Sequence, residues 1–442
     1  MAGQNLKSES RKPNSNRLVP ALLDWFSANA RDLPWRRTRD PYAIWVSEIM
    51  LQQTQVKTVM PYWKRWMREL PTIKAVADAS PDKIHKLWEG LGYYTRARNL
   101  QKAAQQIVAR HGGRFPQNFD DVLALPGIGR YTAGAICSIA FNQPTPILDG
   151  NVIRVLTRIF GIGENPKAKK TNARLWKLAG GLVIHASRIT QHAPRFGSRT
   201  RTKDENDSAN SHLNQSLMEL GALVCAPRNP RCRICPVKKL CVAFREDRVE
   251  ELPNLGKRET TTARRFVAFV VERNGRFLVR QRPAGVVNAH LWEFPNVEVE
   301  AGILPAVEPG FQPGGKNSGN PKPGKNPREI PSGRMPPSPA GRRPAATSLA
   351  CVAKNLGFEI RNAKPLCTVK HSITRYRITL EAFRVRFGGA ISASPKNFKM
   401  ERRGTPPSET GVWLAPAQMR QLAFTAAHKK LASIAANRIL SG

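Results

Sequence analysis

The sequence predicts a multidomain protein in which an all-α domain is followed by an α+β domain. From Leu18 to about Phe244, apolar residues recur at helical spacing and the pattern breaks at proline or glycine. From Arg265 the apolar pattern changes to a period of two, which is typical of strands. Residues 301–346 contain 19 Pro or Gly, too many for a packed core, so we expect a disordered insertion in the second domain.

Helices are expected at three clear stretches of the first region. They are YAIWVSEIMLQQT (42–54), PDKIHKLWEGLGYYTRARNLQKAAQQIVARHG (81–112) and NVIRVLTRIFGIG (151–163). In the last stretch, five apolar residues share one helix face: Val152, Val155, Leu156, Ile159 and Phe160. Residues 185–212 have few apolar residues and no period, which predicts a solvated loop insertion.

The second region predicts a mostly antiparallel sheet with one helix. RRFVAFVVERNGRFLVRQRP (264–283) has the pattern of two strands joined at Asn274-Gly275, a strong hairpin signal. A helix-like stretch (345–358) and further strand-like runs (366–385) follow the insertion. Strands that precede and follow a helix in this way indicate an α+β domain.

The charge balance indicates a polyanionic partner. With 71 Lys+Arg against 32 Asp+Glu, the formal net charge is +39. Because each neutralised phosphate releases counterions, nucleic acid is the first candidate; a ribosome-like or merely basic surface is the alternative. Met1 to Arg17 is polar and basic without the apolar core of a signal peptide, and no run reaches the length of a membrane helix. We therefore expect a cytoplasmic protein.

Four of the seven cysteines crowd into CAPRNPRCRICPVKKLC. Four thiolates within such a segment can close around one metal centre, either tetrahedral zinc or an iron-sulfur cube, and the spacing does not decide between them. Four reduced, buried thiols are the remaining alternative. Basic residues throughout the same loop favour a phosphate-seeking surface. The four cysteines are Cys225, Cys232, Cys235 and Cys241.

The stretch LPGIGRYTAGAI (125–136) has a Gly-x-Gly turn that opens a helix. Such a turn offers backbone N–H groups to an anion, and the helix dipole adds to the attraction. For this pattern taken alone, a tight helix-helix turn without a ligand is the simpler explanation.

Glu48 is the first candidate acid. Its neighbours at helical spacing are Ile44, Trp45, Leu51 and Gln52, so its carboxylate projects beside apolar and amide groups. A glutamate in such surroundings has a raised pKa and can serve as a general acid near neutral pH. Pairing with an arginine at a helix contact is the structural alternative.

A second carboxylate occurs in ILDGNVIRVL (147–156). Asp149 or Asn151 is expected to be the N-cap of the helix that follows. A catalytic role for Asp149 requires that it face Glu48.

Taken together, these motifs resemble the helix-hairpin-helix DNA glycosylase superfamily with its iron-sulfur loop, and most closely the MutY-type adenine DNA glycosylases. The matching pieces cover most of residues 18–244: LPWRR, WVSEIMLQQTQV, LWEGLGYYTRARNL, LPGIGRYTAGAI, ILDGNVIRVL and NQSLMELGALVCAPRNPRC with the four cysteines. GRFLVRQRPAGVVNAHLWEFPNVEVE resembles the family's Nudix-like lesion-recognition domain.

The resemblance implies a domain plan. A disordered basic tail (1–17) precedes an iron-sulfur module formed by 18–33 and 144–245, with the insertion 185–212. A six-helix-barrel module with the hairpin spans 34–143. A linker (246–262) leads to the Nudix-like domain (263–442), which carries the insertion 301–346.

The resemblance also implies the chemistry: hydrolysis of the N-glycosidic bond of adenine mispaired with 8-oxoguanine or guanine, without strand cutting. Glu48 would protonate adenine, Asp149 would stabilise the charge on the sugar, and Asn151 would orient Asp149. The cysteines would hold one 4Fe-4S cluster. We expect a nucleoid-associated monomer acting on double-stranded DNA.

The implied DNA-binding residues fall into four groups. The family's adenine pocket corresponds to Trp35, Arg36, Leu51 and Gln215. Tyr93 matches the wedge that fills the gap left by the extruded base, and Gln53 and Thr54 match contacts to the opposite base. Gly127 and Gly129 would present N–H groups to a phosphate.

Two features depart from the pattern. Ile373, Thr374 and Arg375 stand where the family has a Phe-Ser/Thr-His turn that inspects 8-oxoguanine; Thr374 keeps a hydroxyl. The stretch TSLACVAKNLGF (347–358) lacks the acidic residues with which a Nudix hydrolase holds magnesium, so this domain is expected to bind rather than hydrolyse.

Two other functions are compatible with part of these motifs. An endonuclease III-like bifunctional glycosylase shares the hairpin and cluster, but its lysine nucleophile would align with Tyr131, and a phenol cannot form an imine. The rival also lacks the second domain. A non-catalytic DNA-binding or redox-sensing protein would not need both carboxylates together with the pocket residues.

Overall fold

The computed structural model describes residues 13–191, 208–256, 260–299, 363–373, 375–386 and 411–437. The chain divides into two compact units. Unit 1 comprises Met1–Thr260 with Val286–Leu291 and Gln421–Ala423, and unit 2 comprises the remainder. The units are described separately below.

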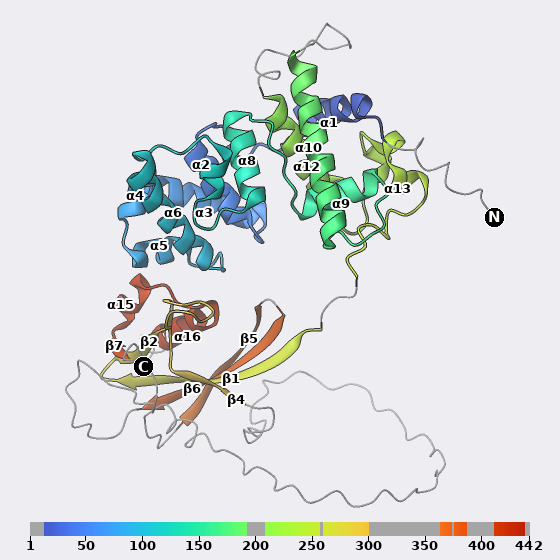
Figure 1. Ribbon diagram of the computed structural model, residues 1–442. Helices are drawn as coiled ribbons and strands as arrows, with labels where there is room; N and C mark the ends of the chain where they lie inside the picture. Colours follow the sequence, from blue (N-terminus) through green and yellow to red (C-terminus); the bar gives the residue numbers. More distant parts are fainter. Residues whose placement is uncertain are drawn as a thin grey trace, which may run out of the picture. The chain divides into compact units, whose positions relative to one another are not determined.

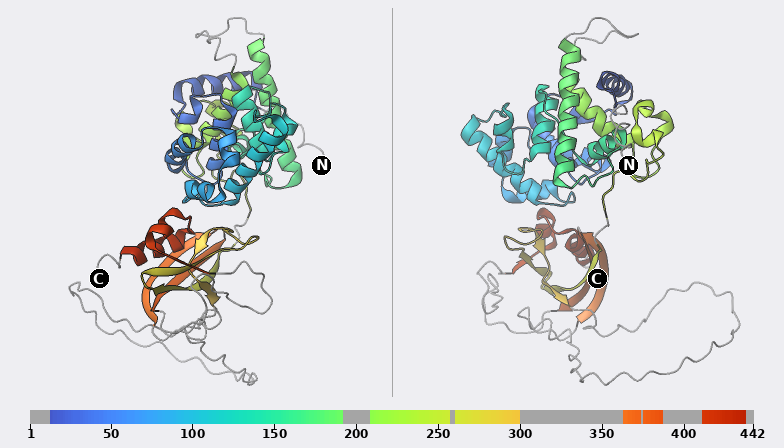
Figure 2. Two further views of the ribbon diagram at one scale, coloured as in Figure 1. Left: turned by 90° about the vertical axis from the view of Figure 1, so that its left-hand side faces the viewer. Right: turned by 45° about the vertical axis from the view of Figure 1, so that its right-hand side comes forward.

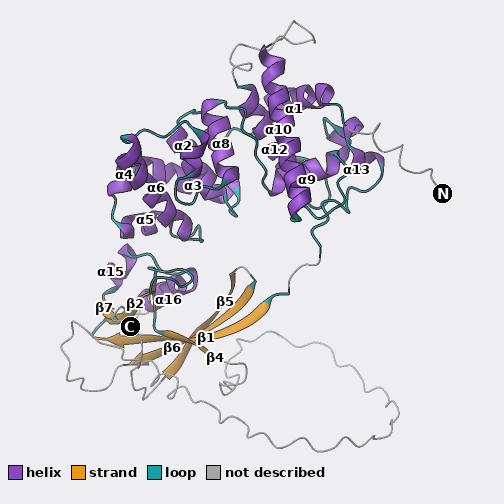
Figure 3. Cartoon of the chain, viewed as in Figure 1, coloured by secondary structure: helices purple, strands orange, loops and turns teal. Residues whose placement is uncertain are grey.

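Unit 1 is helical (Figures 1 and 3). Its helices are α1 (Ser15–Asn29), α2 (Pro41–Leu51), α3 (Val56–Glu69), α4 (Ile73–Asp78), α5 (Pro81–Trp88), α6 (Thr95–His111), α7 (Phe119–Leu123), α8 (Arg130–Phe141), α9 (Gly150–Ile159), α10 (Lys169–Gln191), α12 (Ala209–Leu223) and α13 (Val242–Arg245), with 3-10 turns η2 (Pro34–Arg36), η3 (Cys232–Ile234) and η4 (Lys238–Leu240).

Two hydrophobic cores fill unit 1. One is built mainly from residues between Leu33 and Cys137, and the other from the segments Leu18–Leu23 and Ala135–Val237. Helix α8 belongs to both, because Ala133 and Ile136 pack in the first core and Ala135 in the second. Figures 1 and 2 show that α8 lies between two groups of helices. Helices α2 to α6 gather on one side of it, and α9, α10 and α12 lie on the other.

Helix α8 also lies close to the segment that leads into α9. A Cβ atom added to Gly134 would stand 2.3 Å from the backbone oxygen of Pro146, so only glycine permits this approach. The small-residue character of RYTAGAICSIAF therefore reflects packing on both faces.

The predicted loop 185–212 is wrong at both ends. Helix α10 continues to Gln191, and α12 begins at Ala209. Ala186 is buried and Ile189 packs against the second core, so helical spacing persists there although the segment is polar overall. Residues 192–207 lie outside the described residues.

Two expected boundaries also shift. Helix α1 begins at Ser15, with Asn14 as its N-cap, so residues 15–17 of the expected tail are helical. In the expected linker, Leu252 is buried and its carbonyl accepts a 2.8 Å hydrogen bond from Arg158 Nε, which fastens this part to unit 1.

Unit 2 is built on a seven-stranded sheet with the order β3-β2-β1-β6-β5, in which β4 pairs with β1 and β7 with β2 (Figure 1). Its elements are β1 (Thr262–Arg273), β2 (Arg276–Gln281), β3 (Trp292–Glu293), β4 (Asn296–Val299), β5 (Ala363–Ile373), β6 (Tyr376–Arg386), β7 (Val412–Leu414), α15 (Pro416–Gln421) and α16 (Ala426–Asn437).

The hairpin expected at Asn274-Gly275 is confirmed. Arg273 pairs with Arg276, and both turn residues have positive φ, 50° and 69°, as a tight hairpin turn requires. The pairings between the named strands are antiparallel except that β1 and β6 run parallel over eleven residue pairs, which the mostly antiparallel prediction did not anticipate. An isolated parallel bridge also joins Trp292 and Phe424. The helix expected at 345–358 and the insertion 301–346 lie outside the described residues.

In the described ranges, no helix has the length and apolar character needed to cross a membrane.

Candidate active site

Glu48 lies in the interior of helix α2. Asp40 caps this helix by accepting from the Tyr42 N–H at 3.0 Å, and Pro41 occupies its first position. The Glu48 residue is only 5% exposed. Burial raises the pKa of its carboxyl to about 7, with a further rise from Asp149 and opposing effects from Tyr131 and Arg36. Glu48 is therefore substantially protonated at neutral pH.

The hydrogen-bond partner of Glu48 is Tyr131, on the first turn of α8. The Tyr131 hydroxyl donates to Glu48 Oε2 at 2.8 Å. Burial raises the pKa of the phenol well above its ordinary value, and the two carboxylates add to that rise. Among the described residues no arginine forms an ion pair with Glu48, so the arginine-pairing alternative does not apply.

Asp149 is the N-cap of α9 and also a constrained carboxylate. Its Oδ1 accepts from the Val152 N–H at 2.7 Å, and its Oδ2 accepts from Asn151 Nδ2 at 2.9 Å. Burial raises the pKa of Asp149, while these hydrogen bonds oppose the rise. Since Asp149 contributes to the pKa shifts of both Glu48 and Tyr131, the two carboxylates share one site.

Arg154 connects this site to the cysteine loop. Its Nη2 donates to Asn151 Oδ1 at 2.9 Å, and its Nε donates to the Cys225 carbonyl at 2.7 Å. Asn151 is thus held from two sides, by Asp149 and by Arg154.

A buried ion-pair group was missed by the sequence analysis. Glu219 on α12 has a side chain 1% exposed and accepts bidentate hydrogen bonds from Arg31 and from Arg36, at 2.7 to 3.0 Å. These bonds hold the pKa of Glu219 at about 2 against the effect of burial. The available signal was a single acidic residue within the apolar stretch SLMELGAL.

Two of the predicted pocket residues, Arg36 and Gln215, line one polar pocket with Thr38, Arg39, Ile139, Ser208, Ser211 and His212. Gln215 Nε2 donates to Ser211 Oγ at 3.0 Å. Trp35 lies instead in the first core, edge-on to Trp63 at 5.9 Å, and Leu51 packs against that core.

The residues predicted to enter the duplex lie on two turns. Gln53 follows the end of α2 with φ 58°, and Tyr93 precedes α6 with φ 47° and 43% exposure. Thr54 Oγ1 accepts from Arg96 Nη2 at 3.3 Å. Non-glycine residues rarely adopt positive φ, so both turns are strained and need support.

The glycine turn joins α7 to α8. Gly127 has φ 78°, and a Cβ added to it would stand 2.6 Å from Asn99 Cβ. Gly129 is the N-cap of α8. Since glycine has no side chain, it accepts no hydrogen bond from the first N–H groups of the helix.

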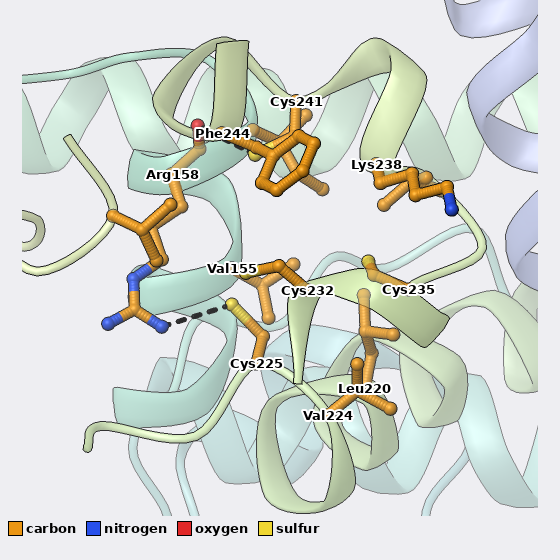
Figure 4. A pocket seen from close by; sticks show the side chains of 13 residues that line it. Val155, Arg158, Leu220, Val224, Cys225, Cys232, Cys235, Lys238, Cys241 and Phe244 are labelled. Atoms are coloured by element: carbon orange, nitrogen blue, oxygen red, sulfur yellow. Dashed lines mark hydrogen bonds between the residues drawn. The ribbon is translucent and has the colours of Figure 1, made fainter. Parts of the chain in front are cut away.

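The four cysteines line one cavity with apolar walls, including Val155, Leu220 and Val237 (Figure 4). Burial raises the pKa of the Cys235 thiol to about 12 and also raises the pKa of Cys232 and Cys241. In the described part of the chain, no three His, Cys, Asp or Glu side chains are grouped as a single metal ion requires. Figure 4 shows the four thiol side chains distributed around the cavity.

Arg158 is a buried charged residue beside these thiols. It is 2% exposed, and its Nη1 donates to Cys225 Sγ at 3.4 Å and to the Ala226 carbonyl at 2.8 Å. The Cys241 thiol donates to the Arg158 carbonyl at 3.4 Å.

In unit 2, Ile373 ends β5 and Arg375 lies in the turn before β6. Arg375 Nη2 donates to the Tyr376 hydroxyl at 3.2 Å. Thr374 lies outside the described residues.

The helical hairpin, the buried acid and the four-cysteine loop define the class of base-excision DNA repair proteins. Residues 46–180 match the model described as "HhH-GPD superfamily base excision DNA repair protein". The adenine DNA glycosylase of Buchnera aphidicola subsp. Acyrthosiphon pisum is 37% identical over 276 residues, covering 62% of this chain and 72% of that protein. The chain belongs to the adenine DNA glycosylase family.

The match covers a smaller share of the length of other adenine DNA glycosylases. The adenine DNA glycosylase of Rattus norvegicus is 39% identical over 331 residues, covering 63% of this chain and 60% of that protein. The chain thus spans less than two thirds of this relative's length. Among solved structures, a thermostable thymine-DNA glycosylase is 29% identical with a TM-score of 0.44, covering 52% of this chain and 97% of that one.

Proposed function

We propose that this protein is a monofunctional DNA glycosylase that hydrolyses the N-glycosidic bond of adenine mispaired with 8-oxoguanine or guanine. The observation that carries this proposal is Glu48, a buried carboxyl whose pKa is raised to about 7 and which is hydrogen-bonded to Tyr131. The group is therefore available as a proton donor at neutral pH.

The two carboxylates take different roles. Glu48 donates its proton to a ring nitrogen of adenine, and the electron pair of the breaking C–N bond goes to the departing base. The developing positive charge on the sugar is stabilised by Asp149, which the Val152 N–H and Asn151 keep oriented. Water then adds to the sugar carbon and releases a proton to the ionised carboxylate of Glu48.

Tyr131 supports base removal without strand cutting. A lyase needs an amine that forms an imine with the sugar, and the phenol of Tyr131, engaged with Glu48, cannot supply one. This distinguishes the proposal from the bifunctional rival.

We assign Arg31, Arg36 and Glu219 to the wall of the adenine pocket, with Gln215. The carboxylate of Glu219 is hydrogen-bonded to both arginines, so the three side chains are held in fixed positions and need little reorganisation on base binding. Trp35 and Leu51 contribute through the apolar core on which this wall rests.

The donor set around the cysteine cavity fits one 4Fe-4S cluster held by Cys225, Cys232, Cys235 and Cys241. The thiols face one cavity from several sides, which suits a polynuclear centre better than a single tetrahedral zinc. Burial raises the pKa of Cys232, Cys235 and Cys241, so the thiolate forms of these three need a bound cation. When bound, the cluster supplies a rigid centre that organises the basic loop around it.

The substrate proposed is double-stranded DNA carrying A:8-oxoguanine or A:G. The net charge of +39 supports phosphate binding, and Gly127 and Gly129 place the N-terminus of α8 for one phosphate contact. Tyr93 would fill the gap left by the adenine, with Gln53 and Thr54 at the opposite base. Unit 2 is proposed as the lesion-binding, Nudix-like domain, and the protein as a cytoplasmic, nucleoid-associated monomer.

The test uses four duplexes, which carry A:8-oxoguanine, A:G, A:T and thymine glycol, with half of each sample treated with alkali after incubation. We expect free adenine from the mispairs and strand scission only after alkali. Scission without alkali, or an adduct trapped by borohydride, would show a lyase instead. Binding without release of any base would favour a non-catalytic protein.

A further inference from the structure

Arg96, on the first turn of α6, is hydrogen-bonded to six oxygen atoms from two separate turns. Its Nη1 donates to the carbonyls of Ile49 at 2.8 Å, of Met50 at 3.0 Å and of Gln52. Its Nη2 donates to Thr54 Oγ1 at 3.3 Å and to the carbonyls of Leu91 and Gly92, each at 3.2 Å. The guanidinium also lies over the rings of Trp88 and Tyr93.

The first group of acceptors is the C-terminal end of α2. The last carbonyls of a helix have no intrahelical partner and carry its negative dipole end, so a cation there is stabilising. Arg96 therefore caps the helix that contains Glu48. The six oxygen acceptors of Arg96 are five backbone carbonyls and one hydroxyl, all of them neutral groups.

Both strained turns depend on this guanidinium. Gln53 and Tyr93 have left-handed φ, and each directly follows a residue whose carbonyl Arg96 binds: Gln52 in one turn and Gly92 in the other. Such a conformation is energetically unfavourable for a non-glycine residue and persists where surrounding contacts enforce it.

We propose that Arg96 is a positioning residue that locks the turns 52–54 and 91–93 together and fixes both to the helix that carries Glu48. The side chains that enter the duplex and the acid that protonates the extruded base are thereby set in one arrangement. This inference rests on the proposed function, because it assigns Tyr93, Gln53 and Thr54 to the DNA-facing surface.

The test is a double-mutant cycle on single-turnover excision of adenine from an A:8-oxoguanine duplex, with Arg96→Lys and Tyr93→Ala. Lysine keeps the charge but has a compact ammonium with three donors, which cannot span both turns. We expect each single variant to lose at least tenfold in rate. The double variant should lose little more than the worse single variant, because both disable the same wedge. Multiplying losses would overturn the proposal.

Arg65→Lys is the matched control. Arg65 is also a partly buried arginine, with Nη2 donating to the Leu87 carbonyl at 2.7 Å and its guanidinium over the Tyr62 ring, but it contacts neither turn. We expect a near wild-type rate for Arg65→Lys, and combination with Tyr93→Ala should add nothing beyond Tyr93→Ala alone. If Arg65→Lys lowers the excision rate as much as Arg96→Lys does, the effect of Arg96 is one of general packing and the positioning role is contradicted.

Hydrogen exchange of the free protein supplies a readout that does not require catalysis. Arg96→Lys should accelerate exchange in both 49–54 and 91–94 while the other helices keep their protection. Acceleration in one turn alone, or equally across all helices, would overturn the positioning role. The wild-type reaction is measured first, and absence of adenine release there contradicts the proposed function. If wild type releases adenine but the rate losses of Arg96→Lys and Tyr93→Ala multiply in the double variant, only the role of Arg96 is contradicted.

Discussion

The Tyr131 hydroxyl donates a 2.8 Å hydrogen bond to Glu48 Oε2, in a site where burial raises the pKa of that carboxyl to about 7. A donated hydrogen bond stabilises the ionised carboxylate and so counteracts part of the effect of burial. Tyr131 thus sets how far into the alkaline range Glu48 keeps its proton.

Tyr131→Phe is expected to shift the pH profile of excision. The reaction needs protonated Glu48, so the single-turnover rate falls as pH rises through its pKa. Loss of the stabilising hydrogen bond raises that pKa further, and the alkaline limb should move to higher pH. Tyr62→Phe, which removes a hydroxyl bonded to the Glu89 carbonyl, is the control and should leave the limb in place. A downward shift for Tyr131→Phe would contradict this account.

Glu48→Gln should abolish excision and leave DNA binding intact. Loss of a positioned general acid typically costs 10²–10⁴-fold in rate, and the amide is close to isosteric with the carboxyl. Binding to an A:8-oxoguanine duplex, measured by fluorescence anisotropy, should remain within about threefold of wild type, a difference below 1 kcal/mol. Retained turnover would place the acid elsewhere.

Glu219→Gln should destabilise the fold by about 3 kcal/mol at pH 7, because it leaves two buried arginine contacts without their anion. The folded-state pKa of Glu219, about 2, is below its unfolded value. Its contribution is therefore present above the unfolded pKa and is lost as pH falls towards 2. Urea unfolding of both proteins should show the difference narrowing below about pH 4.5.

The control for this experiment is Arg37→Gln, which breaks an exposed ion pair with Asp32, with both side chains more than two thirds exposed. Such pairs contribute about 0–1 kcal/mol. An equal loss from both substitutions would mean that the buried pairs of Glu219 contribute no more than a surface pair.

The glycine turn offers a paired test. Gly127→Ala places a Cβ 2.6 Å from Asn99 at φ 78° and should lower stability by about 1–3 kcal/mol and weaken DNA binding. Gly129 has φ −99°, and an added Cβ meets nothing within 4 Å, so Gly129→Ala should be tolerated in thermal unfolding. Equal unfolding temperatures for the two variants would contradict the strain argument.

Arg158→Met should weaken retention of the proposed 4Fe-4S cluster. Arg158 donates to Cys225 Sγ from a fully buried position, so its charge offsets that of the thiolates. We expect lower iron content and faster bleaching of the visible absorbance with a chelator, whereas Lys239→Met on the same loop should behave like wild type. An unchanged bleaching rate in Arg158→Met would show that this arginine does not help to retain the cluster.

Local signals predicted much of the fold and the site. The apolar period distinguished the helical region from the sheet, and Asn274-Gly275 located the hairpin. Of the two residues predicted as possible N-caps, Asp149 and Asn151, the structure has Asp149. The raised pKa expected for Glu48 followed from its apolar helix neighbours, and the structure has it.

Features set by distant parts of the chain were not accessible. Glu219 meets Arg31 across 188 positions, and β1 pairs in parallel with β6 across more than a hundred residues. The six acceptors of Arg96 are mostly backbone carbonyls, which have no sequence signature. The end of α10 was missed because its polar residues outnumber the few that pack.

Helix α8 contributes side chains to both cores of unit 1, and Gly134 lies against the backbone of Pro146. Glu48 is in the first core's helix α2, Asp149 caps α9 of the second, and Tyr131 stands on the helix shared by both. The two cores of unit 1 consequently cannot move apart as rigid bodies without breaking the packing that they share at α8. In the proposed reaction the nucleotide is therefore the part that moves, by rotating out of the duplex to reach two carboxylates held in fixed positions.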